Sequence, residues 1–362
     1  MDKSLYFEFT KKNFPALVTS IVEKINEKRQ QTLPYLYKDL LNVTFSADGR
    51  WSSVLAEYNR VAADIVSLDS ELPLKSRDTL TTAHGDIPKM GLKLYLSEKQ
   101  MKDIDAMIAQ GFPFAQIAQK IFEDTPRVIE AIYERIEDIF LSELSSGVGV
   151  SERNNGTGVR IDVGYLNSNK FGVSSLWASN PTTCTPIDDI QKVIDKSIDD
   201  QNIITDLWVD DAWLNGFYKA AQVRAQYAFD SGVSVSNSTV PVLDFDKAAQ
   251  VIATKWNITL HRVARKVKTE INGKKQSHNP WQQGMGVFTC DAILGDLVWT
   301  NVVESTRPVA NVQYQTADQF ILVSKYSIVD PLREFTASQA MVIPIINNVD
   351  RIYQLDSTQV QQ

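Results

Sequence analysis

Cysteine and histidine are scarce in this sequence, and the motifs of common enzyme families are missing. Cys184 and Cys290 are the only cysteines among 362 residues, which excludes a disulfide framework and a cysteine-rich zinc site. We interpret both as small buried hydrophobic residues. His84, His261 and His278 lie far apart beside turn-like neighbours, so we interpret them as exposed. With no glycine-rich phosphate loop, nucleophile elbow or H-E-x-x-H motif, the sequence favours a non-enzymatic protein without metal or cofactor.

Long hydrophobic runs are also missing. The longest apolar stretch, Met341 to Ile346, is far shorter than the ~20 residues that a helix needs to cross a bilayer. Residues 1–20 contain no apolar segment of signal-peptide length. We therefore expect a soluble protein that is made in the cytosol and has no membrane partner.

The overall charge is acidic. The chain has 37 Lys and Arg against 44 Asp and Glu, a net charge of −7, and its isoelectric point is about 5.2. Proteins that grip nucleic acid are usually basic, so a general DNA-binding role is disfavoured, although a local basic patch is compatible with these numbers. Composition is that of an ordinary globular protein, with 43% hydrophobic and 22% charged residues, and the length suggests about two domains.

The first hundred residues contain a long polar segment between two predicted strands. Helical spacing predicts a helix over 15–31, and a mixed arm follows to a turn at 47–49. Strands are predicted at 65–68 and 90–96, separated by about twenty residues that are rich in charged and hydroxyl-bearing side chains. This segment has too little apolar material to pack on its own subunit. We therefore predict a long protruding hairpin that is held by a partner.

The next fifty residues carry the strongest helical signals. Ser97 and Gln100 form a capping box for a helix that Gly111 ends. A second helix is predicted over 114–122. A third begins with Thr125 as N-cap and ends at Gly147. Together they predict a long helix that is broken twice.

The remainder alternates between helical and strand-like patterns and predicts an α+β fold. A strand is expected at 158–165, a helix at 186–200, a buried strand at 203–209, helices at 212–229 and 245–254, and a strand at 258–267. The rest is strand-like, at 287–289, 298–303, 320–324 and 341–346.

Charges of opposite sign gather in two segments of this part. Residues 185–211 contain eight Asp and two Lys, a net charge of −6, whereas 261–278 contain six Lys and Arg against one Glu, a net charge of +5. The basic run contains Asn272-Gly273, a hairpin turn signal, and lacks the interleaved aromatic residues of a single-strand binder. We favour a solvated basic hairpin, or one that pairs with a neighbour's acidic face, over a phosphate-binding one.

Candidate contact residues between subunits come from these two segments and from the predicted protruding hairpin. They are Glu71, Lys75, Arg77 and Asp78 in the hairpin, Asp188, Asp189, Asp199 and Asp200 in the acidic segment, and Arg262, Arg265 and Lys266 in the basic one.

A metal-dependent enzyme remains as an alternative. Asp206, Asp210 and Asp211 lie in or after the strand at 203–209, and carboxylates at a strand end can hold a metal. The same position also suits the N-cap of the following helix, where a carboxylate is favourable. We favour the cap.

The order of these features resembles that of the major capsid proteins of tailed bacteriophages. Short motifs bring the resemblance closer to the lambda-type major capsid protein family over roughly residues 50–356. They are Arg160 to Tyr165, Trp177, Asn279-Pro280-Trp281, Gly286-Val287-Phe288, Leu294-Gly295, Glu304, Tyr326 to Pro331, Glu334-Phe335-Thr336 and Ile343-Pro344.

The resemblance implies a Hong Kong 97-type phage capsid fold with five parts. These are an N-terminal arm (1–50), an extended β-hairpin loop (51–96), the spine helix and the start of the peripheral domain (97–165), an axial domain (166–300), and a C-terminal return to the peripheral domain (301–362).

The resemblance also implies a structural function in the virion. Subunits would form hexamers and pentamers of an icosahedral head shell that encloses double-stranded DNA without reading its sequence. Portal, scaffolding and decoration proteins are the implied partners, with scaffolding as a separate chain. We do not predict covalent crosslinking through Lys75. An encapsulin-like bacterial nanocompartment shell is the alternative on the same fold.

Overall fold

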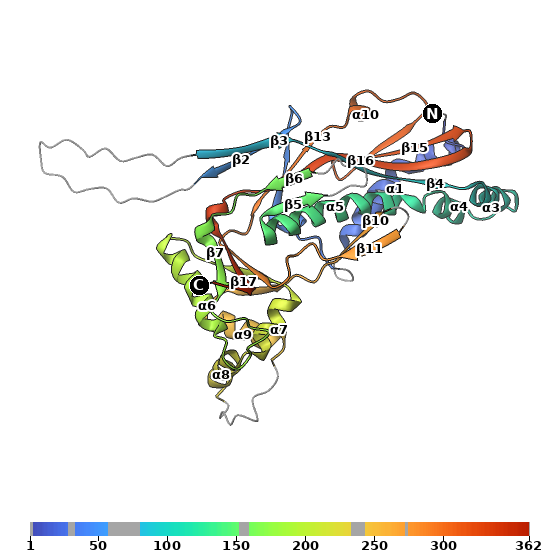
Figure 1. Ribbon diagram of the computed structural model, residues 1–362. Helices are drawn as coiled ribbons and strands as arrows, with labels where there is room; N and C mark the ends of the chain where they lie inside the picture. Colours follow the sequence, from blue (N-terminus) through green and yellow to red (C-terminus); the bar gives the residue numbers. More distant parts are fainter. Residues whose placement is uncertain are drawn as a thin grey trace, which may run out of the picture. The chain divides into compact units, whose positions relative to one another are not determined.

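The computed structural model divides the chain into two compact units (Figure 1). It describes residues 3–27, 33–56, 80–151, 159–232, 243–271 and 274–361. Unit 1 consists of Met1–Trp51, His84–Asp138 and Asp296–Ile345, and unit 2 of Ser52–Ala83, Ile139–Gly295 and Ile346–Gln362. Each unit is therefore assembled from segments that are distant in sequence.

Unit 1 is built mainly of long helices and one antiparallel sheet. Its elements are α1 (Phe7–Glu27), α2 (Tyr37–Leu40), β1 (Leu41–Phe45), β4 (Lys89–Leu96), α3 (Glu98–Ala109), α4 (Phe114–Ile121), the larger part of α5 (Asp124–Ser146), β13 (Gly295–Thr300), α10 (Val303–Thr306), β14 (Gln313–Ala317), β15 (Ile321–Val329) and β16 (Leu332–Ile346).

The sheet of unit 1 has six strands and is covered by α5. The strand order is β1-β13-β16-β15-β14, and β4 also pairs with β16, from Lys89 opposite Met341 to Leu96 opposite Glu334. The buried stripe of α5 includes Ile129 and Ile132, which are at most 1% exposed. Ser338 on β16 donates a hydrogen bond of 2.6 Å to the Val128 carbonyl of α5, which ties helix and sheet together.

In its described residues, unit 2 combines a mixed five-stranded sheet with the helices α6 to α9. Its elements are β5 (Val148–Ser151), β6 (Val159–Asp162), η2 (Asn167–Asn169), β7 (Lys170–Val173), α6 (Pro186–Asp199), β8 (Asp206–Val209), α7 (Asp211–Lys219), α8 (Ala221–Asp230), α9 (Phe245–Trp256), β9 (Thr259–Arg262), β10 (Val267–Ile271), β11 (Lys274–His278), β12 (Met285–Thr289), η3 (Val349–Arg351) and β17 (Ile352–Val360).

The core of unit 2 lies between this sheet and its helices. The strand order is β7-β17-β12-β8-β9, with β7–β17 and β8–β9 parallel and the other two pairs antiparallel. Trp177, Trp213 and Phe217 are fully buried and pack on one another, with ring centroids 5.0–6.2 Å apart; Trp213 stacks on Phe217, and Trp177 meets Trp213 edge to face. Two further sheets have two strands each, β10–β11 and β5–β6.

Most of the predicted elements are present, and the α+β class is confirmed. The capping box of Ser97 and Gln100 begins α3, Gly111 follows it in a left-handed conformation, and Gly147 ends α5 with φ of +77°. The basic run forms the predicted hairpin, because Ile271 is paired with Lys274 across a two-residue connection. The predicted strand at 65–68 lies outside the described residues.

Some boundaries were wrong, and tertiary contacts explain two of them. Helix α1 begins at Phe7 with Pro15 inside it, because Phe14 is buried and stacks on Phe122 at a centroid distance of 6.0 Å. The helix predicted over 212–229 is two helices. Ala220 is buried in an extended conformation, and the Ala221 amide donates instead to the Pro181 carbonyl at 2.8 Å.

Other boundaries moved by a few residues. The strand predicted at 258–267 is divided between β9 and β10, and α5 begins at Asp124 rather than after Thr125. Strand β5 was not predicted. None of the helices in the described residues combines the length and the apolar composition that crossing a membrane would take.

Candidate functional site

The base of the predicted protruding hairpin is a pair of strands, β2 (Arg50–Ala56) and β3 (Leu80–Asp86), which form a two-stranded sheet. Close contacts within unit 1 hold the start of β2 and the end of β3. The Ile87 amide donates to the Gly49 carbonyl at 3.0 Å, and a Cβ on Gly85 would lie 2.8 Å from the Trp51 indole nitrogen. Glu71, Lys75, Arg77 and Asp78 lie outside the described residues.

The acidic segment does not present all its carboxylates to solvent. Asp189 is 1% exposed and accepts hydrogen bonds from the Ser174 amide at 3.0 Å, the Ser174 hydroxyl at 2.6 Å and the Trp177 indole at 3.0 Å. It organises the core of unit 2. Its place among the candidate contact residues was therefore wrong, because a buried and saturated carboxylate cannot reach a neighbour.

The other acidic candidates lie closer to the surface. Asp200 is half-buried and accepts hydrogen bonds from the Lys196 ammonium and the Tyr353 hydroxyl. Part of its capacity to accept hydrogen bonds is therefore used inside unit 2. Asp188 is exposed and accepts one hydrogen bond, of 2.9 Å, from Gln222. Asp199 is exposed.

The basic candidates also differ from one another in exposure and in ion pairing. Arg262 forms a bidentate ion pair with Asp211, with nitrogen–oxygen distances of 2.6 and 3.1 Å, and these hydrogen bonds raise the pKa of the guanidinium. Its charge is therefore largely matched within its own chain. Arg265 is half-buried, whereas Lys266 is exposed beside the β10–β11 hairpin.

Asp206, Asp210 and Asp211 do not converge on one point. Asp210 caps α7 and accepts from the Trp213 amide at 2.9 Å and the Gly284 amide at 3.1 Å. Asp211 pairs with Arg262, and Asp206 lies 2.7 Å from His261 Nε2. In the described residues, no three His, Cys, Asp or Glu side chains are grouped as a metal site. Nothing in this geometry supports the metal-dependent enzyme.

The histidines and cysteines are placed mainly by packing. His84 and His278 are exposed, as expected. His261 is not a simple surface residue, because its ring is half-buried and stacks on Trp208 at a centroid distance of 4.0 Å. Cys184 is buried. Cys290 is only half-buried, which differs from the prediction, but desolvation still raises the pKa of its thiol to about 12 and keeps it protonated near neutral pH.

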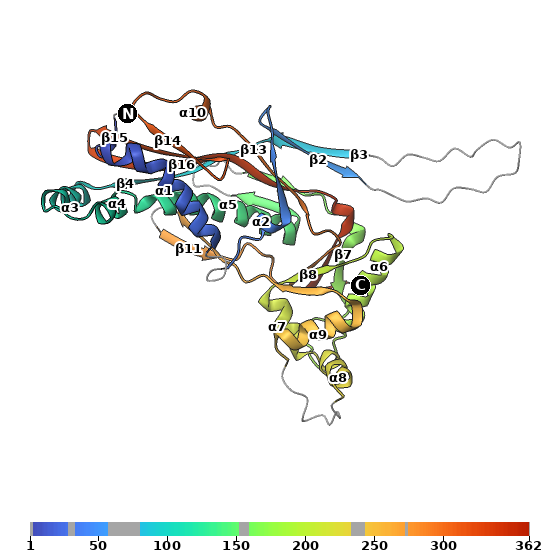
Figure 2. The same ribbon diagram turned by 180° about the vertical axis from the view of Figure 1, so that it is seen from behind.

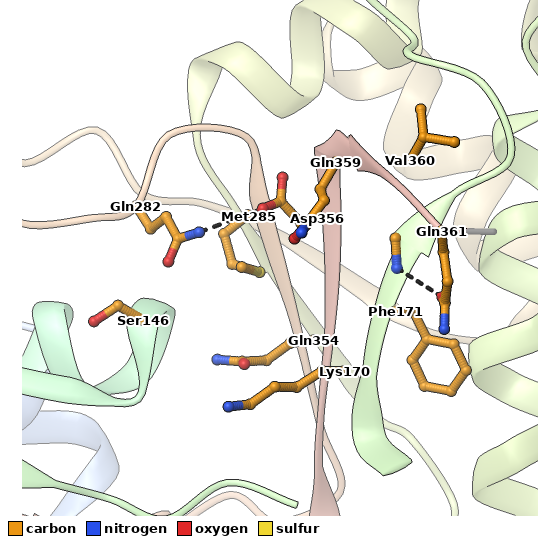
Figure 3. A pocket seen from close by; sticks show the side chains of 11 residues that line it. Ser146, Lys170, Phe171, Gln282, Met285, Gln354, Asp356, Gln359, Val360 and Gln361 are labelled. Carbon is orange, nitrogen blue, oxygen red and sulfur yellow. Dashed lines mark hydrogen bonds between the residues drawn. The ribbon is translucent and has the colours of Figure 1, made fainter. Parts of the chain in front are cut away.

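A polar cavity of about 380 Å³ opens beside β7 and β17 (Figure 3). Its lining includes one cation, Lys170, one carboxylate, Asp356, and the amides of Gln282, Gln354 and Gln361. Asp356 already accepts from Thr358 and Gln282, and Gln361 accepts from the Gly172 amide. The lining contains no nucleophile with an adjacent base, so the cavity does not support catalysis.

No pattern in the sequence predicts how residues 3–5 are anchored in unit 1. The fully buried carboxylate of Glu334 accepts hydrogen bonds from the Ser4 hydroxyl at 2.5 Å and the Leu5 amide at 3.0 Å. Lys325, also fully buried, lies 4.0 Å from Glu334 and donates to Thr336 and to the Ile121 carbonyl. Ser327 donates to the Lys3 carbonyl at 2.7 Å. Residues 3–5 thus complete a buried polar cluster.

A second buried group was equally invisible in the sequence. Glu143 on α5 is 0% exposed, and in the described part of the chain neither carboxylate oxygen has a hydrogen-bond partner. A Cβ on Gly149 would lie 2.6 Å from Glu143 Oε1, so the carboxyl group packs directly on the backbone of β5. Burial raises the pKa of Glu143 well above its usual range.

Comparison with solved structures identifies the architecture. A protein assigned as the capsid protein of a prophage of E. coli CFT073 aligns with a TM-score of 0.59 at 12% identity, over 93% of this chain and 96% of that chain. The protein has a Hong Kong 97-type capsid fold. A phage-related protein from Bordetella bronchiseptica aligns with a TM-score of 0.51 at 12% identity, over 96% and 98% of the two chains.

A third capsid-fold match comes from a cyanophage. The capsid of cyanophage A-1(L) aligns with a TM-score of 0.50 at 11% identity, over 90% of this chain and 93% of that chain. No family model and no curated protein matches the sequence. At identities of 11–12% the shared property is the capsid fold itself.

Proposed function

We propose that this capsid-fold protein is the major capsid protein of a tailed bacteriophage, of the lambda type. Copies of the chain form hexamers and pentamers, and these close into an icosahedral head shell around double-stranded DNA. The observation that carries the proposal is the end-to-end alignment with a prophage capsid protein, which leaves little of either chain unmatched. A structural, non-enzymatic role agrees with the dispersed carboxylates and the protonated cysteines.

Features of the described residues support assembly with other copies. The strands β2 and β3 pair only with each other in the described part of the chain. Large apolar side chains are unusually exposed on both units, including Val329 at 68%, Ile203 at 80% and Phe229 at 80%. Burial of these side chains on a partner would remove their apolar surface from water. In a ring of identical subunits, one surface of each subunit contacts a different surface of the next, and such rings can be joined into a closed shell.

The domain names follow from the same proposal. Residues 1–50 are the N-terminal arm, 51–96 the extended loop, 97–165 the spine helix with the start of the peripheral domain, 166–300 the axial domain and 301–362 the return to the peripheral domain. We propose portal, scaffolding and decoration proteins as further partners, with the virion as the final location and the bacterial cytoplasm as the site of synthesis. An acidic shell agrees with a genome that is enclosed without being bound tightly.

The test is expression of the chain alone and together with its neighbouring genes, followed by electron microscopy of the purified particles. We expect closed icosahedral shells, and DNA-filled heads when the phage packaging genes are present. A chain that stays monomeric under all these conditions contradicts the proposal. Shells that enclose a cargo enzyme instead identify the encapsulin-like compartment.

A further inference from the structure

The β10–β11 hairpin is an isolated element of unit 2. Every residue of β11 is exposed, and β10 and β11 pair only with each other in the described residues. A two-stranded hairpin without a third strand or a covering helix is marginally stable in water. A partner that covers such a hairpin would therefore stabilise it.

The hairpin carries a compact set of lysines. Lys268 lies opposite Ser277 and Lys275 opposite Glu270, so these four side chains share one face. Lys266, directly before β10, is exposed as well. At about 3.3 Å per strand residue, the positive charges from Lys266 to Lys275 extend over roughly 13 Å. In the described part of the chain, none of these lysines forms an ion pair.

Helix α6 carries a matching set of aspartates. Asp188, Asp195 and Asp199 are exposed and separated by seven and four residues, which places them in one line along the helix. Lys192 lies on the same line, where its ammonium donates to the Ser174 hydroxyl and pairs with Asp189, so the line keeps a net negative charge. At 1.5 Å per residue this line is about 16 Å long. Asp189 points inward, and the packing that buries it turns the side of α6 with the three exposed aspartates toward solvent.

The two charged elements do not meet within one chain. Helix α6 and the hairpin belong to unit 2 and lie well apart in both views (Figures 1 and 2). Contact between these lysines and helix α6 therefore requires α6 of another molecule.

We propose that the β10–β11 hairpin docks on helix α6 of a second copy of this chain. The inference rests on the proposed shell function and specifies one of its contacts. Three features favour a second copy of the chain as the partner. The hairpin and α6 have opposite charges and similar lengths, and a homo-oligomer contains equal numbers of them. In a closed ring, every subunit offers one hairpin and receives another, so a modest contact is repeated at every interface.

The experiment is a charge-swap cycle on the full chain. The hairpin variant is Lys268→Glu with Lys275→Glu, the helix variant is Asp195→Lys with Asp199→Lys, and the third protein combines all four changes. Lys99→Glu with Lys102→Glu, on exposed positions of α3, is the control with the same change in net charge as the hairpin variant. Light scattering and sedimentation measure the lowest concentration at which shells form, from 0.1 to 1 M salt.

Each exposed ion pair changes an association constant by about 1.5- to 5-fold. We therefore expect each double variant to raise the critical concentration by roughly 2- to 30-fold at 0.1 M salt, and by less than twofold at 1 M. The combined variant should return to within twofold of the wild type, and the control should not change it.

The outcomes separate this inference from the proposed function and from a DNA-facing hairpin. If wild-type shells form but the combined variant does not rescue the two double variants, the docking contact is wrong while the shell function stands. If the hairpin variant assembles normally and loses packaged DNA instead, the hairpin faces the genome and the inference is overturned. If no variant, including the wild type, forms shells, the proposed function fails first.

Discussion

The Ser4–Glu334 contact allows a quantitative test of how the N-terminus is held. Replacing Ser4 by alanine removes the 2.5 Å hydrogen bond to a fully buried carboxylate and leaves Glu334 with the Leu5 amide and the more distant Lys325 ammonium. A hydrogen bond to a charged group contributes about 1.5–3 kcal/mol to the free energy of unfolding. Since 1.4 kcal/mol is about a factor of ten in an equilibrium constant, the docked N-terminus should open roughly 10- to 150-fold more often.

Hydrogen exchange at the backbone amides of Leu5 and Tyr6 measures this opening directly. Both amides are hydrogen-bonded in the cluster, the second to Ser4 Oγ at 3.3 Å. Thr19→Ala is the matched control, because the Thr19 hydroxyl donates to the Pro15 carbonyl on the exposed side of α1 and should cost no more than about 0.5 kcal/mol. Unchanged protection of Leu5 in the Ser4→Ala protein would refute the view that this hydroxyl anchors the chain.

Three further predictions concern the other parts of the molecule. Because burial raises the pKa of Glu143, the folded state keeps the proton above the usual carboxylate pKa, and wild-type stability should fall as the pH rises above that usual pKa. Glu143→Gln should flatten this dependence in thermal melts, and equal slopes would contradict it. Asp189→Ala leaves the Trp177 indole and the Ser174 donors without their acceptor and should destabilise unit 2 by at least about 2 kcal/mol in urea unfolding, whereas Asp199→Ala on the exposed side should change it by less than about 0.5 kcal/mol. Replacing residues 60–76 by a short glycine-serine linker should leave capsomers folded by circular dichroism but unable to close shells in negative-stain images; normal shells would show that the loop is dispensable.

Local signals in the sequence were sufficient for several helix ends and for the general class of the fold. The capping box at Ser97, Gly111 and Gly147 specify helix ends through interactions within a few residues, so the pattern and the structure agree there. The alternation from Met90 to Leu96 likewise identified β4, in which Met90 and Leu96 are buried although Leu92 is exposed. The resemblance to capsid proteins came from the order of such elements, and the fold comparison agrees with it.

Contacts between distant segments decided what the sequence left open. Nothing near Asp189 distinguishes it from Asp188, and only the positions of Ser174 and Trp177 bury one and expose the other. Arg262 and Asp211 are 51 residues apart, and their pairing depends on β8 and β9 lying side by side. Ser4 and Glu334 are separated by 330 residues. A buried charge needs donors from wherever the chain can supply them, and that supply is fixed only when the tertiary structure forms.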